Sequence, residues 1–221
     1  MTEQTQGNTL QDILKWEEEN NYSRETIMIA SGQDLALGAV VGKINLGTCP
    51  TTGTAGSNTG GGTCTAVTAG AKAKLGIYTL KCIIGQTGAG VFSVEDPDGF
   101  GLPNAVVGYA YANDQINFTL NDGSPDFAYG DSFTIEIEEG SGEITELDLD
   151  AVDGSQNAYG FTIAAYDALN GAIAGVVISR NAIIVSADLV WQETSPAITD
   201  AEMAAALAQL AAKGIKTADE V

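Results

Sequence analysis

The fold is decided by residues 23–44, SRETIMIASGQDLALGAVVGKI, in which two short strands are predicted on either side of a turn. Residues 24–30 alternate in polarity as a half-buried strand does. Ser31-Gly32-Gln33-Asp34 is typical of a turn, and the apolar residues 38–44 predict the second strand. This stretch therefore indicates a β structure, but it is too short to form a domain by itself.

The missing strands are predicted about a hundred residues later, in residues 146–191. Asp153-Gly154 is a turn pair, and apolar, β-branched runs occupy residues 159–165, 174–179 and 182–191. We interpret the two stretches as halves of one discontinuous β domain.

The residues between them have a different character. Residues 45–75 consist largely of Gly, Thr, Ala and Ser, and much of this segment is predicted to be loop. Alternating apolar residues then predict strands at 77–84, at Phe92 and Val94, at 116–120 and at 133–137. Short strands at regular spacing favour an inserted antiparallel β-sandwich of immunoglobulin-like type.

The expected fold class is therefore mainly β. We predict an N-terminal arm at 1–22, a core built from 23–46 and 143–221, and an inserted sandwich at 47–142. The ends of the insert, Gly47 and Gly142, should lie close together, because an insertion into a surface loop requires it.

Both ends of the chain carry helix signals. Leu10, Ile13 and Leu14 follow a possible N-cap, Thr9, at helical spacing. The arm is either a solvated, frayed terminus or a segment that orders on docking. Near the C-terminus, Thr199 and Glu202 form a capping box for a helix at 200–213, and Gly214 is a stop signal.

The charge is strongly negative, with 29 acidic residues against 9 basic ones and a net charge of −20. Such a surface repels phosphate, so nucleic acid and anionic membranes are not expected partners. The charge either serves solubility or limits contacts between particles that carry many copies. No run of about 20 apolar residues predicts a membrane span, and no targeting segment is recognised, so we expect synthesis in a cytosol.

Catalytic and metal sites are not predicted, and no cofactor is expected. The chain has no histidine, which removes the commonest general base at neutral pH. Its three cysteines lack zinc-site spacing; Cys49 and Cys64 are candidates for a disulfide, although a reducing compartment argues against one.

Three loops contain residues that also occur in ligand sites. Residues 96–101 look slightly like a calcium loop, but the Asp-Gly pair favours a hairpin turn. Residues 85–90 lack the Gly-Lys-Ser/Thr ending of a phosphate loop and are interpreted as a hairpin connection. Asp122, Asp126 and Asp131 are candidates for an acidic rim, although acids at loop tips are usually just solvated.

A family resemblance rests on three pieces in order: residues 22–44, then Asp153-Gly154-Ser155-Gln156, and then Ala187-Asp188-Leu189-Val190-Trp191. Together they resemble the head decoration proteins of tailed bacteriophages, the family of the phage lambda decoration protein. The resemblance implies a non-enzymatic cement protein that binds the major capsid protein. It would sit as homotrimers at threefold and quasi-threefold positions outside an expanded head and stabilise it.

The resemblance also suggests where the capsid is contacted. The N-terminal arm would add a strand to an exposed edge of the capsid, and we place the contact at Tyr22, Ser23, Arg24, Glu25, Thr26 and Ile27. The alternative is that these residues begin the domain's own sheet.

Two other functions remain as alternatives. One is a virion- or cell-surface module whose sandwich binds carbohydrate, for which Tyr109, Tyr111, Phe127 and Tyr129 are the candidate aromatic residues. Tyr109 and Tyr111 share a strand face, which a hydrophobic core explains equally well. The other is a hydrolase that uses paired carboxylates, for which no particular pair stands out.

Overall fold

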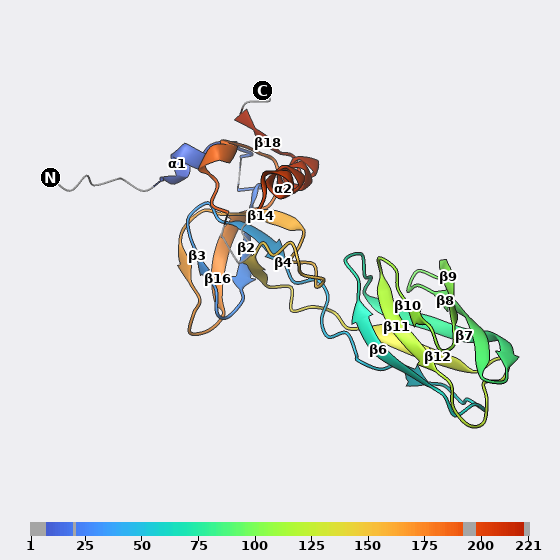
Figure 1. Ribbon diagram of the computed structural model, residues 1–221. Coiled ribbons are helices and arrows are strands. Elements are labelled where there is room, and N and C mark those ends of the chain that lie inside the picture. Colours follow the sequence, from blue (N-terminus) through green and yellow to red (C-terminus); the bar gives the residue numbers. More distant parts are fainter. Residues whose placement is uncertain (1–7, 20, 192–197, 219–221) are drawn as a thin grey trace. The chain divides into compact units, whose positions relative to one another are not determined.

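The computed structural model describes residues 8–19, 21–191 and 198–218. The chain divides into two units, one from Met1–Ile44 and Gly142–Val221 and the other from Asn45–Ser141 (Figure 1). We call them the barrel unit and the sandwich unit. The structure is mainly β, with antiparallel sheets and one long helix near the C-terminus.

The two connections between the units run side by side in opposite directions. Gly142 N–H donates to Ile44 O over 2.9 Å, Gly140 N–H donates to Asn45 O over 3.0 Å, and Gly47 N–H donates to Glu138 O over 2.7 Å. The chain therefore leaves and re-enters the barrel unit at one place.

The barrel unit is built around five strands in the order β13-β2-β16-β14-β4, which close into a barrel. Every pairing is antiparallel except that of β13 with β2, which meet only at Ile144 and Ile29. The strands are β2 (Arg24–Ile29), β4 (Val40–Lys43), β13 (Ile144–Glu146), β14 (Ala158–Thr162) and β16 (Ile173–Ile178).

Both faces of the barrel wall are buried, which explains why its strands contain adjacent apolar residues. Val41 packs with Ile29 and Val177 in one cluster, whereas its neighbour Val40 packs with Phe161 in a second cluster. Successive side chains point to opposite faces of a strand, so an adjacent buried pair needs a covering layer outside the barrel. Burying a ring such as that of Phe161 stabilises the fold by about 1.5–3 kcal/mol.

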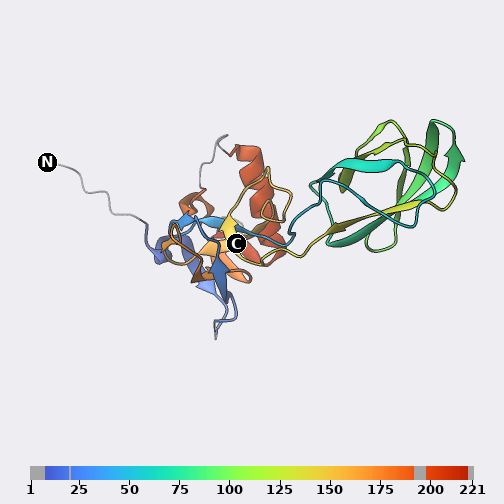
Figure 2. The same cartoon turned by 90° about the horizontal axis from the view of Figure 1, so that it is seen from below.

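Helix α2 (Asp200–Ala212) supplies part of that layer. It contacts β14 and β18 (Ile215–Thr217), and Figure 2 shows it lying against the barrel. The predicted capping box is present, because Thr199 N–H donates to Glu202 Oε2 over 2.7 Å and Glu202 N–H donates to Thr199 Oγ1 over 3.4 Å. Gly214 ends the helix with a φ of +81°, a conformation that favours glycine.

The rest of the layer outside the barrel is a three-stranded sheet, and one of its strands comes from the expected N-terminal arm. Its order is β1-β17-β18, from β1 (Leu14–Glu17), β17 (Ala182–Ile184) and β18. Before it, Thr9 caps the one-turn helix α1 (Leu10–Ile13), whose Ile13 is fully buried. Two minor elements complete the unit: the hairpin of β3 (Asp34–Leu35) with β15 (Tyr166–Asp167), and the 3₁₀ turn η1 (Ser186–Asp188).

Residues 8–19 therefore differ from a free arm. Ile13 lies in the hydrophobic cluster with Ile184 and Leu210, and Val185 N–H donates to Ile13 O over 2.8 Å. A helix this short is unstable by itself in water. Here the burial of Ile13 and the pairing of β1 with β17 supply the free energy that holds it in place. Residues 1–7 and 20 lie outside the described part of the chain.

The sandwich unit consists of two antiparallel sheets that share one hydrophobic core. The sheet orders are β10-β11-β6 and β5-β12-β7-β8-β9, and the core contains the packed rings of Phe92, Phe127 and Phe133. The strands are β5 (Thr54–Ala55), β6 (Thr63–Ala69), β7 (Gly76–Gln86), β8 (Ala89–Glu95), β9 (Gly101–Val106), β10 (Ala110–Tyr111), β11 (Ile116–Asn121) and β12 (Ser132–Ile137).

Much of residues 45–75 is loop, as expected, but strand β6 lies within this segment. Its sequence, TCTAVTA, has only two large or sulfur-containing apolar residues, Cys64 and Val67, and both are buried against the core. A bulge shifts the register opposite Asn117 and Thr119, which breaks the simple alternation in the sequence.

Candidate functional site

The predicted contact residues fall in two places: Arg24, Glu25, Thr26 and Ile27 begin strand β2 in the barrel wall, and Tyr22 and Ser23 lie in the turn just before it. From residue 24 onward they pair with β16, so they also begin the domain's own sheet, as in the alternative above. Tyr22 is 54% exposed and Thr26 is exposed, whereas Ser23 is fully buried. Ser23 Oγ donates to Asn181 O over 2.6 Å and accepts from Glu18 N–H, which gives it a structural role.

The two charged residues of this segment are paired within the unit. Arg24 forms a two-point contact with Glu17, at 2.6 and 2.8 Å. Glu25 Oε2 accepts hydrogen bonds from Tyr159 Oη at 2.7 Å, from Ser179 Oγ at 3.1 Å and from Arg180 at 3.1 Å.

Those contacts control the protonation of Glu25. Burial disfavours its charged form, but hydrogen bonds from Tyr159 and Ser179 and the charges of Lys43 and Arg180 outweigh burial and lower the pKa of the carboxyl. Burial and the bond to Glu25 raise the pKa of Tyr159 to about 12, so the phenol remains a hydrogen-bond donor at neutral pH.

The backbone of β2 has one edge that is largely unpaired. Ser179 N–H donates to Ser23 O over 3.0 Å, so residue 23 faces β16, whereas Ala30 N–H donates to Ile144 O over 2.9 Å on the opposite edge. Backbone groups alternate in direction along a strand, so Thr26 and Met28 turn their N–H and C=O groups away from β16.

Within the described part of the chain, no strand pairs with Thr26 on that edge, because β13 meets β2 only at the bridge between Ile144 and Ile29, next to Met28. The side chains of Thr26 and Met28 are exposed. An exposed strand edge of this kind is a template for pairing with another chain.

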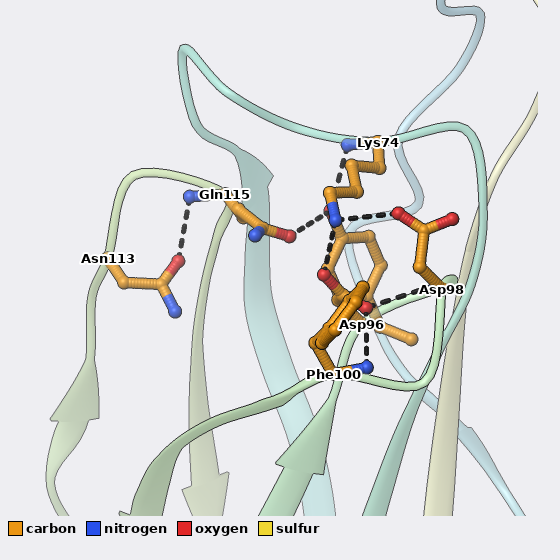
Figure 3. A network of polar contacts seen from close by, with 7 residues as sticks. Lys74, Asp96, Asp98, Phe100, Asn113 and Gln115 are labelled. Atoms are coloured by element: carbon orange, nitrogen blue, oxygen red, sulfur yellow. Dashed lines mark hydrogen bonds and ion pairs between the residues drawn. The ribbon is translucent and has the colours of Figure 1, made fainter.

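In the sandwich unit, the loop that slightly resembles a calcium site is a hairpin turn held by a lysine (Figure 3). Lys74 Nζ lies 2.6 Å from Asp96 Oδ2 and 2.7 Å from Asp98 Oδ2, so an ammonium occupies the place between the two carboxylates. Asp96 Oδ1 accepts the N–H groups of Asp98 and Phe100.

The same network extends to a second loop through Tyr78. Its hydroxyl accepts Lys74 N–H over 2.8 Å and donates to Gln115 Oε1 over 3.0 Å, while Gln115 N–H donates to Asn113 Oδ1 (Figure 3). The network ties three loops at one end of the sandwich, and none of its buried side-chain polar atoms lacks a hydrogen-bond partner, as a structural role requires.

The other candidate loops are also structural. Residues 85–90 belong to the β7–β8 hairpin, in which Gln86 pairs with Ala89 across a two-residue turn. The expected acidic rim is wrong for Asp131, which is 4% exposed and accepts the N–H groups of Thr59, Gly60 and Ala128. Asp122 is exposed.

The four aromatic candidates for carbohydrate binding do not form one strip. Tyr111 and Phe127 are buried in the core, whereas Tyr109 and Tyr129 are 72% and 77% exposed and lie in separate loops. Tyr109 precedes β10 in a bend, so the expected shared strand face of Tyr109 and Tyr111 is wrong.

The cysteines and acids of the described residues provide no metal site, since no group of three or more potential ligands lies together among them. Cys49, Cys64 and Cys82 are all free thiols, and burial raises the pKa of each. Among the helices described, none is long and apolar enough to cross a membrane.

One cluster was not identified from the sequence. Lys43, Tyr159, Arg180 and Lys213 are far apart along the chain but gather around Glu25 and Tyr22. The sequence did offer one signal for this cluster. The chain has few basic residues among many acidic ones, so a group of them changes the local electrostatic potential strongly.

Comparison with known proteins identifies the family. The model of the bacteriophage lambda head decoration protein D family matches residues 3–215, and the chain belongs to this family of structural phage proteins. No curated protein matches the chain.

Two solved structures of FlgL from Xanthomonas campestris, in space groups H3 and C2, align at 16% identity. They cover 50% and 55% of this chain, with TM-scores of 0.32 and 0.31, which are too low to indicate a shared fold. The chain spans only 34% and 33% of their lengths.

Proposed function

We propose that this protein is a cement protein that binds the major capsid protein on the outside of an expanded phage head. It attaches as homotrimers at threefold and quasi-threefold positions, with the barrel unit as the capsid-binding part. Three copies acting together need only modest affinity each, because the first contact raises the effective concentration of the others. Attachment stabilises the head, since a ligand that binds only the assembled shell shifts the equilibrium toward it.

The observation that carries this proposal is the unpaired edge of β2 in a chain of the decoration family. Thr26 offers backbone groups with no strand opposite them in the described residues, so a segment of the capsid protein can add there as a further strand. Tyr22 to Ile27 thus remain the proposed contact, with Tyr22 and Thr26 accessible and Ser23 supporting the strand from inside.

A single substitution tests the edge. Thr26→Pro removes the N–H that faces the unpaired edge without removing a bond to β16, whereas Thr26→Ala keeps the N–H and is the matched control. We expect Thr26→Pro to weaken binding to purified expanded, undecorated heads by about tenfold or more, and Thr26→Ala to bind nearly as the wild type does.

Electron microscopy of the decorated heads provides the second measurement. Density at the threefold and quasi-threefold positions is expected with the wild type, together with a higher melting temperature of the head. A wild-type protein that does not bind expanded heads would refute the proposed function, and equal binding of the proline and alanine variants would refute the role of the edge.

A further inference from the structure

Four barrel strands meet at one end of the barrel, and their sequence places basic and aromatic side chains there. β4 ends at Lys43, and its antiparallel partner β14 begins beside it, with Ala158 opposite Gly42. β16 ends at Ile178, which pairs with Phe161 of β14 and with Arg24 at the start of β2. We call this end the basic end and define it by Tyr22, Lys43, Tyr159, Arg180 and Lys213.

Aromatic rings at the basic end lie between cations. The ring of Tyr159 has Lys213 Nζ at 4.4 Å and Lys43 Nζ at 5.2 Å from its centroid, and Lys213 Nζ also donates to Tyr159 O over 3.1 Å. The guanidinium of Arg180 lies 5.4 Å from the centroid of the Tyr22 ring. Cation–π contacts of this kind hold the charged groups in place without neutralising them.

The basic end has a local excess of positive charge in an otherwise acidic unit. Residues 1–44 and 142–221 contain 19 acidic and only six basic residues, and three of those six are Lys43, Arg180 and Lys213. Glu25 pairs with Arg180 at 3.1 Å, whereas neither lysine has a carboxylate within ion-pairing distance among the described residues.

The charged form of Lys213 is disfavoured at its place in the basic end. Lys213 and Lys43 share one ring, and burial together with the charge of Lys43 lowers the pKa of Lys213 despite the opposing effect of Glu25. Two partly buried cations that share one distant carboxylate and form no close ion pair are stabilised when a further anionic partner arrives.

We propose that the basic end binds an acidic segment of the capsid protein, whose carboxylates pair with Lys43 and Lys213 on either side of Tyr159. This inference rests on the proposed function and deepens it by naming the chemistry of the partner. Tyr22 belongs both to the basic end and to the proposed contact segment, and Glu25 of that segment bonds Tyr159 and Arg180, so a capsid segment that pairs with β2 passes beside these cations.

The charge of the whole chain favours this partner over nucleic acid. A net charge of −20 repels a long polyanion such as nucleic acid, whereas a short acidic segment reaches the cations with little further repulsion.

The test compares two pairs of substitutions that change the net charge equally. Lys43→Met with Lys213→Met keeps apolar stems but removes both charges from the basic end. Lys72→Gln with Lys81→Gln is the control, because both lysines are exposed and lie in the sandwich unit. Binding of the full-length proteins to purified expanded, undecorated heads is measured over a series of salt concentrations.

We expect the double methionine variant to bind about tenfold more weakly than the wild type, with a reduced salt dependence, and the control to bind like the wild type. Equal binding of the methionine variant and the wild type would overturn the inference while leaving the proposed function intact. Failure of the wild type to bind heads would instead remove the proposed function itself.

One further measurement and one reserve variant make the result decisive. If the methionine variant changes the oligomeric state of the free protein in analytical ultracentrifugation, the basic end is a contact between copies and the inference is wrong. If the double variant does not fold, Lys43→Met alone is used, because Lys43 contacts the Tyr159 ring without the backbone bond that Lys213 makes.

Discussion

The hydroxyl of Tyr159 donates a hydrogen bond to Glu25 Oε2 over 2.7 Å and so joins strands β14 and β2, which are separated in the barrel by β16. The residues are 134 positions apart in the sequence. This bond spans the two halves of the discontinuous unit and fixes the carboxylate that also holds Arg180.

Tyr159→Phe removes this donor and is expected to lower the free energy of unfolding of the barrel unit by about 1 kcal/mol. The pKa of Glu25 is lowered in the wild type partly by this bond, so in the variant it should rise toward its ordinary value. Amide hydrogen exchange in β14 measures the stability change, and NMR titration of the Glu25 carboxyl measures the pKa. An unchanged pKa would show that the bond is absent in solution.

Part of this architecture was predictable from local sequence, for a physical reason. The strands that contain Ile27, Leu80 and Phe118 alternate, and the helix after Thr199 has its cap and stop within the same short segment. Local propensity and patterning are sufficient where the interactions that decide the structure lie within a few residues.

The rest depends on contacts between distant residues. Ile13 is buried only because Ile184 and Leu210 lie around it, and the basic end exists only because the barrel brings Lys43 and Lys213 to Tyr159. Asp131 has the sequence context of a solvated loop acid, and its burial follows from loop 56–62, which folds over it.

The close packing of that glycine-rich loop gives a second prediction. A Cβ at Gly62 would lie 2.5 Å from Asn121 O and 2.2 Å from a ring atom of Phe127, whereas a Cβ at Gly101 would meet nothing within 4 Å. Gly62→Ala should therefore destabilise the sandwich unit by about 1–3 kcal/mol, while Gly101→Ala should be nearly neutral. Hydrogen exchange in β7 and β11 compares the two, and equal effects would contradict the packing described.

Lys74 provides a third prediction. Lys74→Met leaves the buried Asp96 without its countercharge, so the melting temperature of the sandwich unit should fall by several degrees. Since an ammonium already lies between Asp96 and Asp98, millimolar calcium should not raise the melting temperature of the wild type. A calcium-dependent increase would show that the loop is a metal site after all.

Asp131 gives the prediction on pH. Burial disfavours its charge, but the N–H groups of Ala128, Thr59 and Gly60 outweigh burial and lower the pKa of the carboxyl below its ordinary value. The ionised side chain therefore stabilises the sandwich unit above the unfolded pKa of about 3.9, and this contribution is lost as the pH falls through the lower folded value.

Asp131→Asn keeps the shape of the side chain but replaces one accepting oxygen with a donor that faces N–H groups. The variant should lose about 1–3 kcal/mol at pH 7, and the difference from the wild type should shrink as the pH falls below about 4. Calorimetry of both proteins between pH 7 and pH 3, with hydrogen exchange in β12 to identify the unit, measures the two slopes. A stability difference that stays constant over this range would mean that Asp131 is not the charged acceptor for the three backbone groups around it.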